Sequence, residues 1–403
     1  MKVIRPLVFL LLLTICSAAQ TWTPEIQVKT RAVGSPRISP DGKRVAYTVN
    51  DAVMNADKSE FVTQVWMSSA DGTGNYQLTF NEKSSTNPKW SPDGSWLAFT
   101  SNRKDNKNNL YVLRANGGEA EQLTDLKSSI SDFEWSPDGN WIAYAVSDAK
   151  SDDEEKNDKG KNDFRWVDEN QKMARLYVIP VAKDANGKRE AKKLTSDNRH
   201  VTGFNWSPDG TRIVFNHVSG PGANDWQSSD IGIVEVASGK ITPLATTPSA
   251  ESALHFSPDG KWISGIASDV PARWAQSYTI RAYPAGGGEP KVMALSYDAQ
   301  PSVIGWTPDG TKIEFSEGKG TGTSIYEADV AAGTLKEIKY SGAVISAISM
   351  CEKPPEVAVI KRGAEKLTQI SHVNTELMKM PYGKTEVIKW KSKDGREIEG
   401  LLT

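Results

Sequence analysis

Six aspartates recur at matching places in the chain, and their carboxylates are the first candidates for chemistry. Each follows Ser-Pro or Thr-Pro and precedes glycine; the six are Asp41, Asp93, Asp138, Asp209, Asp259 and Asp309. A calcium loop needs several oxygen ligands within about a dozen residues, whereas each of these tetrapeptides supplies a single carboxylate. Proline, aspartate and glycine in this order favour a tight turn. We therefore interpret the aspartates as turn residues, and we expect no metal ion and no other cofactor.

Nucleophilic or metal-assisted catalysis would need motifs that this sequence lacks. The Gly-x-Ser-x-Gly elbow of serine hydrolases is absent, and the nearest fragment, around Ser324, has no second glycine. The HExxH and CxxC patterns of metal sites are also absent. The four histidines are His200, His217, His255 and His372. Because His255 occupies a polar place that sister repeats fill with Asn205 and Glu134, we expect it to be an exposed scaffold residue. We name no catalytic, cofactor-binding or metal-binding residue.

Short β-strands must position the tetrapeptides. Apolar and polar residues alternate on both sides of each tetrapeptide, as in FNWSPDGTRIVF at 204–215, which is typical of a hairpin with one buried face. A third strand follows each hairpin, and a closing strand follows the third, as in Gln-Leu-Thr at 77–79 and 122–124. Successive turn aspartates are 52, 45, 71, 50 and 50 residues apart. Four strands per period of this length indicate the blades of a β-propeller.

A seventh unit, at 343–371, has lost the tetrapeptide but keeps the strand pattern. We expect its closing strand at Lys-Leu-Thr, residues 366–368. The other closing strands are expected at 193–195 and, more loosely, around Leu244, Leu295 and Ile338. We therefore predict an all-β fold: a seven-bladed propeller of four-stranded blades that spans residues 20–378. Blades of this kind bury their apolar faces against one another.

One interval between turns is longer because it contains a charged insertion at about 148–172. Its first half has almost no apolar residue, so we expect a solvated loop. Phe164, Arg165 and Trp166 in its second half are expected to begin the return to the blade. We expect Cys351, in an apolar strand context, to be a small buried residue rather than a nucleophile.

The first 19 residues have the layout of a secretory signal peptide. Lys2 and Arg5 precede an apolar run at 7–15, and small residues at 17–19 predict cleavage after Ala19. The run is too short to span a bilayer, although an uncleaved anchor stays open and a lipoprotein at Cys16 is a weaker alternative. We expect a secreted or periplasmic protein without further membrane contact. The net charge of -2 gives no reason to expect nucleic acid as a partner.

After the last blade, residues 379–403 read as two strands, Glu386–Lys391 and Glu397–Leu402, joined by a Lys-Asp-Gly turn. The chain then stops, so we interpret this part as the first β-hairpin of a truncated domain. Together with the signal peptide and the blades, the stretch resembles secreted members of the prolyl oligopeptidase family of serine peptidases, dipeptidyl-peptidase-like or acylaminoacyl-peptidase-like. The residues that carry this resemblance are Trp390, Lys391, Ser392, Asp394, Gly395, Ile398, Gly400 and Leu402.

The resemblance implies a C-terminal α/β-hydrolase domain that begins at this stretch and carries a Ser, Asp and His triad beyond Thr403. It implies acyl transfer on peptide substrates, and a propeller that packs against the hydrolase domain and restricts access to it. In dipeptidyl peptidases of the family, acidic propeller residues recognise the substrate's amino terminus, but nothing in this sequence singles out such a residue. The 403-residue chain alone is expected to be inactive.

Two other readings stay open. A non-catalytic periplasmic binding propeller that resembles the TolB protein would share the tetrapeptide repeats, but it has fewer blades and no need of the final hairpin. A propeller glycosidase with inward carboxylates is the weaker alternative, because no acidic pattern at the blade starts supports it.

Overall fold

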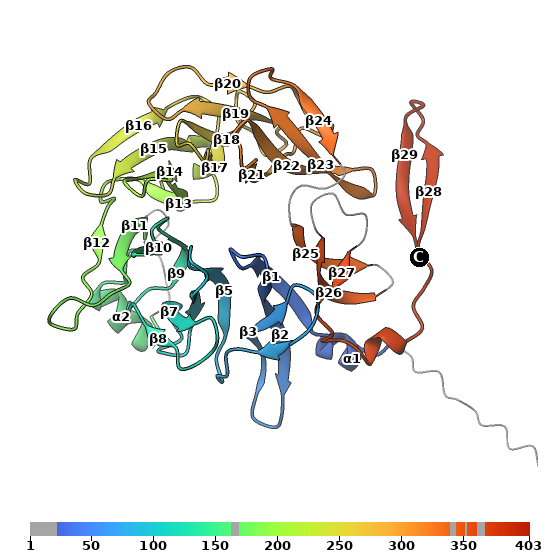
Figure 1. Ribbon diagram of the computed structural model, residues 1–403, viewed down its shortest axis with the longest axis horizontal. Coiled ribbons are helices and arrows are strands. Elements are labelled where there is room, and N and C mark those ends of the chain that lie inside the picture. Colours follow the sequence, from blue (N-terminus) through green and yellow to red (C-terminus); the bar gives the residue numbers. More distant parts are fainter. Residues whose placement is uncertain (1–21, 163–168, 339–343, 351–352, 361–366) are drawn as a thin grey trace, which may run out of the picture.

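The structure is a computed structural model, and it describes residues 22–162, 169–338, 344–350, 353–360 and 367–403. Figure 1 shows small antiparallel sheets set in a ring around a common centre, with the first strand of each sheet nearest that centre. Six sheets have four strands, and the seventh has three among the described residues. The predicted seven-bladed propeller is therefore confirmed. The expected signal peptide, Cys351 and residues 164–166 lie outside the described residues.

The first three sheets follow one another along the chain. Sheet 1 contains β1 (Ala32–Ile38), β2 (Arg44–Met54), β3 (Ser59–Ser69) and β4 (Tyr76–Gln77). Sheet 2 contains β5 (Ser85–Trp90), β6 (Trp96–Ser101), β7 (Asn109–Arg114) and β8 (Glu121–Gln122). Sheet 3 contains β9 (Ile130–Trp135), β10 (Trp141–Ser147), β11 (Ala174–Pro180) and β12 (Lys192–Lys193). A short helix, α1 (Pro24–Lys29), precedes them.

The remaining sheets continue the ring. Sheet 4 contains β13 (His200–Trp206), β14 (Arg212–Val218), β15 (Asp230–Glu235) and β16 (Ile241–Ala245), with the 3-10 helix η1 (Asp225–Ser228) before β15. Sheet 5 contains β17 (Glu251–Phe256), β18 (Trp262–Ser268), β19 (Tyr278–Pro284) and β20 (Lys291–Val292). Sheet 6 contains β21 (Ser302–Trp306), β22 (Lys312–Lys319), β23 (Gly322–Asp329) and β24 (Leu335–Ile338). Sheet 7 contains β25 (Val344–Met350), β26 (Lys353–Ile360) and β27 (Thr368–Gln369), and η2 (Leu377–Lys379) leads to the hairpin β28 (Glu386–Lys391) and β29 (Glu397–Leu402).

The six tetrapeptides form the turns between the first and second strands of sheets 1 to 6. In sheet 4 the Ser207 hydroxyl donates to Asp209 Oδ1 at 2.6 Å and accepts the Arg212 N–H at 2.9 Å. The Thr211 N–H donates to the same carboxylate oxygen at 3.0 Å. The other five turns repeat these three bonds. The interpretation of the aspartates as turn residues is confirmed.

Tryptophans before the turns join neighbouring sheets. The Trp90 indole N–H donates to Arg37 O at 2.9 Å, and that of Trp306 donates to His255 O at 2.9 Å. Trp135 and Trp206 make the same kind of bond to the sheet that precedes each of them. Phe256 has this place in sheet 5, where the Phe256 N–H instead donates to Asn205 Oδ1 at 2.9 Å. Each bond leaves the large apolar ring packed between two blades.

Buried side chains hold neighbouring sheets together. Among the described side chains, six hydrophobic clusters each join two neighbouring sheets. One of them unites Tyr47 of β2 with Val357 and Val359 of β26, so the first and last sheets pack together. Asn374 adds two hydrogen bonds where the first and last sheets meet. Its Nδ2 donates to Arg31 O at 2.9 Å, and its Oδ1 accepts the Arg31 N–H at 3.0 Å.

Two expected closing strands are placed differently. In sheet 7 the closing motif is Gln-Ile-Ser at 369–371 and not Lys-Leu-Thr at 366–368. Ser371 Oγ accepts the Val357 N–H at 2.7 Å, as Thr79 Oγ1 accepts the Val65 N–H at 2.9 Å in sheet 1. In sheet 5 Met293 after β20 is buried, whereas the expected Leu295 is 65% exposed. In both cases the buried apolar residue, rather than the letters Leu-Thr, fixes the register.

The charged insertion is partly helical and not only a loop. Helix α2 (Asp152–Lys159) begins with a capping box, in which Ser151 Oγ accepts the Glu154 N–H and the Glu154 carboxylate accepts the Ser151 N–H. It has no buried residue, so it lies on the surface. In the part of the chain that the structure describes, no helix combines the length and apolar character needed to cross a bilayer.

Candidate functional site

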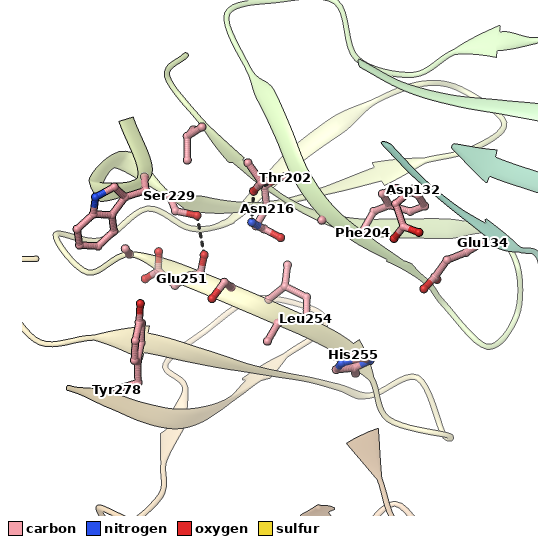
Figure 2. Close-up of a pocket in the computed structure, with 16 residues that line it drawn as sticks. Asp132, Glu134, Thr202, Phe204, Asn216, Ser229, Glu251, Leu254, His255 and Tyr278 are labelled. Carbon is pink, nitrogen blue, oxygen red and sulfur yellow. Dashed lines mark hydrogen bonds between the residues drawn. The ribbon is translucent and has the colours of Figure 1, made fainter. Parts of the chain in front are cut away.

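A cavity of about 480 Å³ lies between sheets 3, 4 and 5, on the side of their inner strands β9, β13 and β17 (Figure 2). Its lining includes Asp132, Glu134, Asn216, Glu251, His255 and Tyr278. Figure 2 shows Glu251 and Tyr278 at one end of the cavity and Asp132 and Glu134 at the other, with Leu254 between them. This volume falls within the range of small-molecule and peptide side-chain sites.

Glu251 begins β17, and its side chain is completely buried. Its main chain is fixed by sheet 4, since its N–H donates to Ser229 O at 3.1 Å and its carbonyl accepts the Ser229 hydroxyl at 2.6 Å. One carboxylate oxygen accepts the Thr247 hydroxyl, and the other has no partner among the described residues. Burial raises the pKa of Glu251 to about 7, against the opposing effect of the Thr247 hydrogen bond.

Glu134 occupies the opposite end in a different setting. Its Oε2 accepts Asn205 Nδ2 at 3.3 Å, and the neighbouring Asp132 is paired with Lys89 at 2.9 Å. Burial raises the pKa of Glu134 to about 7, although the Lys89 ammonium acts in the opposite direction. The Glu134 end of the cavity therefore has a direct ion pair, between Lys89 and Asp132. At the Glu251 end the Arg281 guanidinium, which contacts Ser249 at 3.4 Å, acts on the Glu251 carboxylate and opposes the rise of its pKa.

His255 lines the cavity, so the expectation of an exposed scaffold residue is wrong. The reason is that both faces of a blade are covered by its neighbours, and polar residues on the inner strand are enclosed. His255 is partly buried, and burial lowers its pKa. Its sister residues Asn205 and Glu134 occupy the same register and contact each other across two sheets.

The other histidines have separate local contacts. His200 Nδ1 accepts the Ala174 N–H at 3.0 Å, His217 lies opposite Asp230 in the β14–β15 ladder, and His372 Nδ1 lies 3.2 Å from Gln369 Nε2. Within the described ranges, no group of three or more His, Cys, Asp or Glu residues is placed to hold a metal ion.

Two aromatic residues stand at the Glu251 end of the site. Trp226 of η1 lines the cavity, and its ring centroid lies 5.4 Å from that of Trp274, which is 70% exposed. Gln227 Nε2 donates to Ala272 O at 2.9 Å and joins the same two segments. Both segments connect the second strand of a sheet to its third. Such connections all lie at the end of the ring opposite the tetrapeptide turns.

The C-terminal hairpin lies at this same end. The Thr321 hydroxyl, between β22 and β23, donates to Glu399 Oε1 of β29 at 2.8 Å. The hairpin strands match those predicted from the sequence. Their large exposed apolar side chains are Val387, Ile388, Trp390, Ile398, Leu401 and Leu402. Figure 1 shows the hairpin standing beside the ring rather than within it.

Sequence reasoning missed Glu251, although a signal for it was present. Six residues before each tetrapeptide, sheets 2, 3 and 4 have Ser85, Ile130 and Val201, all buried. Sheet 5 has Glu251 at this place. The sister repeats have apolar or small residues at this position, whereas sheet 5 has an ionisable one. An alignment of the six copies of the repeat reveals this departure.

Known proteins resemble this chain in sequence and in fold. The family model described as TolB beta propeller domain matches residues 19–166. Dipeptidyl-peptidase 5 of Porphyromonas gingivalis is 24% identical over 338 residues, which cover 78% of this chain and 49% of that protein. The uncharacterized peptidase YuxL of Bacillus subtilis is 25% identical over 232 residues, which cover 58% and 29%.

The chain thus spans about half or less of the length of these relatives. The solved structure of acylaminoacyl peptidase from Pyrococcus horikoshii superposes with a TM-score of 0.67 at 17% identity, over 95% of this chain and 59% of that one. The chain is thus similar in sequence to part of two peptidases, and its propeller fold is shared with a solved acylaminoacyl peptidase.

Proposed function

We propose that this chain is the propeller portion of a secreted serine peptidase that cleaves peptides by acyl transfer. The observation that carries the proposal is the hairpin β28–β29, whose apolar side chains remain exposed at the place where the peptidase family motif begins. A two-stranded hairpin of this kind is only marginally stable on its own. Exposed apolar side chains of this size favour a further domain that packs over them. The peptidase relatives are longer than the matched region. In this proposal a C-terminal hydrolase domain, which the family resemblance implies, covers the hairpin.

In this proposal the reacting groups lie beyond Thr403. A serine attacks the peptide carbonyl, a histidine moves the proton, and backbone N–H groups hold the oxyanion. The propeller contributes binding. Two residues of its cavity lining, Trp226 of η1 and Tyr278 at the start of β19, lie toward the end of the ring that carries the hairpin, so a peptide held beside them would lie on the side of the hydrolase domain.

The secreted or periplasmic location belongs to the same proposal and is supported by the composition of residues 1–19. N-terminal sequencing of the protein from its native host tests it. We expect the mature chain to begin at Gln20. A chain that begins at Met1 or at a lipid-modified Cys16 would contradict this expectation.

The experiment that tests the peptidase function compares two proteins. The complete product of the gene and the chain of residues 20–403 are each assayed with dipeptidyl and acylaminoacyl chromogenic substrates. We expect the complete product to release the chromophore and the 20–403 chain to be inactive. Hydrolysis by the 20–403 chain, or none by the complete product with either class of substrate, would contradict the proposal.

A non-catalytic binding propeller is the second candidate, favoured by the family model that matches residues 19–166. The reading frame separates the two. A frame that continues past Thr403 into Gly-x-Ser-x-Gly and a later histidine supports the peptidase. A stop codon directly after Thr403 supports the binding propeller.

A further inference from the structure

Trp274 is the most exposed of the tryptophans that the structure describes, with 70% of its surface accessible to water. It lies in the connection between β18 and β19, at the end of the ring opposite the tetrapeptide turns. Its ring packs against that of Trp226 in η1, and the planes of the two rings are inclined at 59°. Tryptophan is mostly buried in folded proteins, so the exposure of Trp274 requires an explanation.

The two connections that carry these tryptophans are held in place. Gln227 Nε2 donates to Ala272 O at 2.9 Å and fastens one connection to the other. In the first connection the Asp225 carboxylate accepts the Gly222 N–H at 2.8 Å. A Cβ at Gly220 or Gly222 would lie 2.6 or 2.8 Å from Asp225 Oδ2, so the two glycines allow the chain to close around this carboxylate. The aromatic pair is therefore positioned before a ligand arrives, which lowers the entropy cost of binding.

The cavity beside the aromatic pair is apolar in its middle. Trp226 lines this cavity, together with Phe204 of β13, Val218 of β14 and Leu254 of β17. Figure 2 shows Leu254 between the two polar ends. Trp274 extends the apolar surface outward, because its ring packs on that of Trp226. Mostly apolar walls with a few polar groups are typical of sites that bind an organic ligand.

We propose that Trp226 and Trp274, with the apolar middle of the cavity, form a subsite for a bulky apolar side chain of a bound peptide, and that phenylalanine is preferred. The peptide nature of the ligand rests on the proposed function, whereas its apolar character follows from the lining. A phenyl ring gains offset or edge-to-face contact with an indole in addition to the burial of its surface. Tryptophans at binding surfaces often contribute a large share of the affinity.

A domain that packs over the end of the ring is the other occupant that an exposed tryptophan can indicate. Such a domain accounts for Trp274, which faces water, but it leaves unexplained why Trp226 and Leu254 line a cavity between the sheets. A peptide side chain that enters the cavity beside Trp226 accounts for both tryptophans. The subsite therefore explains more of the geometry than a covering domain does.

Peptide binding to the 403-residue chain tests the subsite. Isothermal titration calorimetry compares acetyl-Ala-Phe-Ala-Ala-amide with its counterparts that have alanine or lysine in place of phenylalanine. We expect the phenylalanine peptide to bind at least about tenfold more tightly than the alanine peptide, the range expected for burial of a phenylalanine side chain. The lysine peptide tests cation–π binding to the indoles, and we expect it to bind no more tightly than the alanine peptide. Equal affinity for the phenylalanine and alanine peptides, no binding of the phenylalanine peptide, or tightest binding of the lysine peptide would overturn the proposal.

The variant Trp274→Ala tests the aromatic pair. We expect it to reduce the preference for phenylalanine over alanine at least about threefold, because one aromatic contact is lost. Phe61→Ala is the matched control. Phe61 is 60% exposed and lies near the start of β3 at the same end of the ring, but it is not among the cavity residues. We expect this control to keep the preference, and a folded Trp274→Ala chain that also keeps it would contradict the assignment.

The complete product of the gene separates the subsite from a contact with a covering domain. If Trp274 only contacts such a domain, Trp274→Ala lowers the unfolding temperature of the complete product and leaves the phenylalanine preference of the 403-residue chain unchanged. That pair of results would overturn the proposal. A phenylalanine preference without peptidase activity in the complete product would refute the proposed function alone, and activity without the preference would refute the subsite alone.

Discussion

The turn aspartates and the cavity glutamates are two sets of carboxylates built by the same repeat, and they differ in almost every physical respect. Each turn aspartate accepts a hydroxyl and a backbone N–H and has a lowered pKa. Glu134 and Glu251 lie between blades, where burial raises the pKa of each to about 7. The aspartates repeat because every blade needs the turn. The glutamates do not repeat, and this departure marks the region where ligand chemistry is possible.

The largest expected effect is on the pH dependence of stability. A carboxyl whose folded pKa is about 7 keeps a proton that the unfolded chain releases near pH 4.5. The unfolding free energy should therefore fall as the pH rises from about 4.5 to 7, by at most about 3 kcal/mol for Glu251. Glu251→Gln should remove the contribution of Glu251, so that the unfolding free energy of the variant falls less steeply with rising pH. Urea unfolding at several pH values measures this pH dependence. An unchanged dependence of the unfolding free energy on pH in the variant would contradict the contrast between the turn aspartates and the cavity glutamates.

The next largest effect is expected on the unfolding free energy when the buried serine of a turn is replaced. Ser207→Ala leaves the Arg212 N–H without its 2.9 Å partner in a buried position and removes one donor to Asp209. We expect a loss of about 1–3 kcal/mol in the unfolding free energy. Thr211→Ala is the control, because its exposed hydroxyl also donates to Asp209, at 2.8 Å. Equal losses in the two variants would show that burial is not the deciding factor.

A smaller effect is expected where the blades are joined. Trp206→Phe removes the indole bond to Glu134 O, at 3.3 Å, but keeps an aromatic ring of the kind that sheet 5 has at Phe256. We expect a loss of about 1 kcal/mol. Trp141→Phe, at a 37% exposed position, should cost less. Thermal unfolding of both variants gives the comparison, and a larger loss at Trp141 would argue against the role of the indole bonds.

The smallest effect is expected at an exposed turn carboxylate. Asp41→Asn keeps an acceptor for the Lys43 N–H, which lies 3.1 Å from Asp41 Oδ1, and should change the unfolding free energy by less than about 0.5 kcal/mol. It should also leave the pH dependence of stability between about pH 4.5 and 7 unchanged. Urea unfolding at several pH values measures both, and a flattened slope in this variant would erase the distinction between the two sets of carboxylates.

Most of the fold could be predicted from the sequence because the repeat is local. Period-two alternation around a proline and glycine turn fixes each hairpin, and the Lys-Asp-Gly turn fixed β28 and β29. The closing strand of sheet 7 was misplaced because Ile370 and Ser371 replace the Leu-Thr of other blades while making the same contacts. Helix α2 was missed, although its Ser-x-x-Glu capping box, at Ser151 and Glu154, is visible in the sequence.

The site could not be predicted in the same way, since it is assembled from three sheets. Asp132 and His255 are more than a hundred residues apart, and they line one cavity only because the ring brings β9 and β17 to either side of β13. Alternation shows that a residue on the inner strand is polar, but it does not show which neighbouring blade covers it. Comparison of sister positions would have singled out Glu251, whose counterparts Ile130 and Val201 are apolar.

Labelling with a fluorophosphonate probe tests most directly whether this chain is the propeller portion of a serine peptidase. The complete product of the gene and the 20–403 chain are treated in parallel, and the labelled serine is located by mass spectrometry. We expect one label in the complete product, on a serine beyond residue 403, and none in the 20–403 chain. A labelled serine within residues 20–403, or no label in either protein, would contradict it.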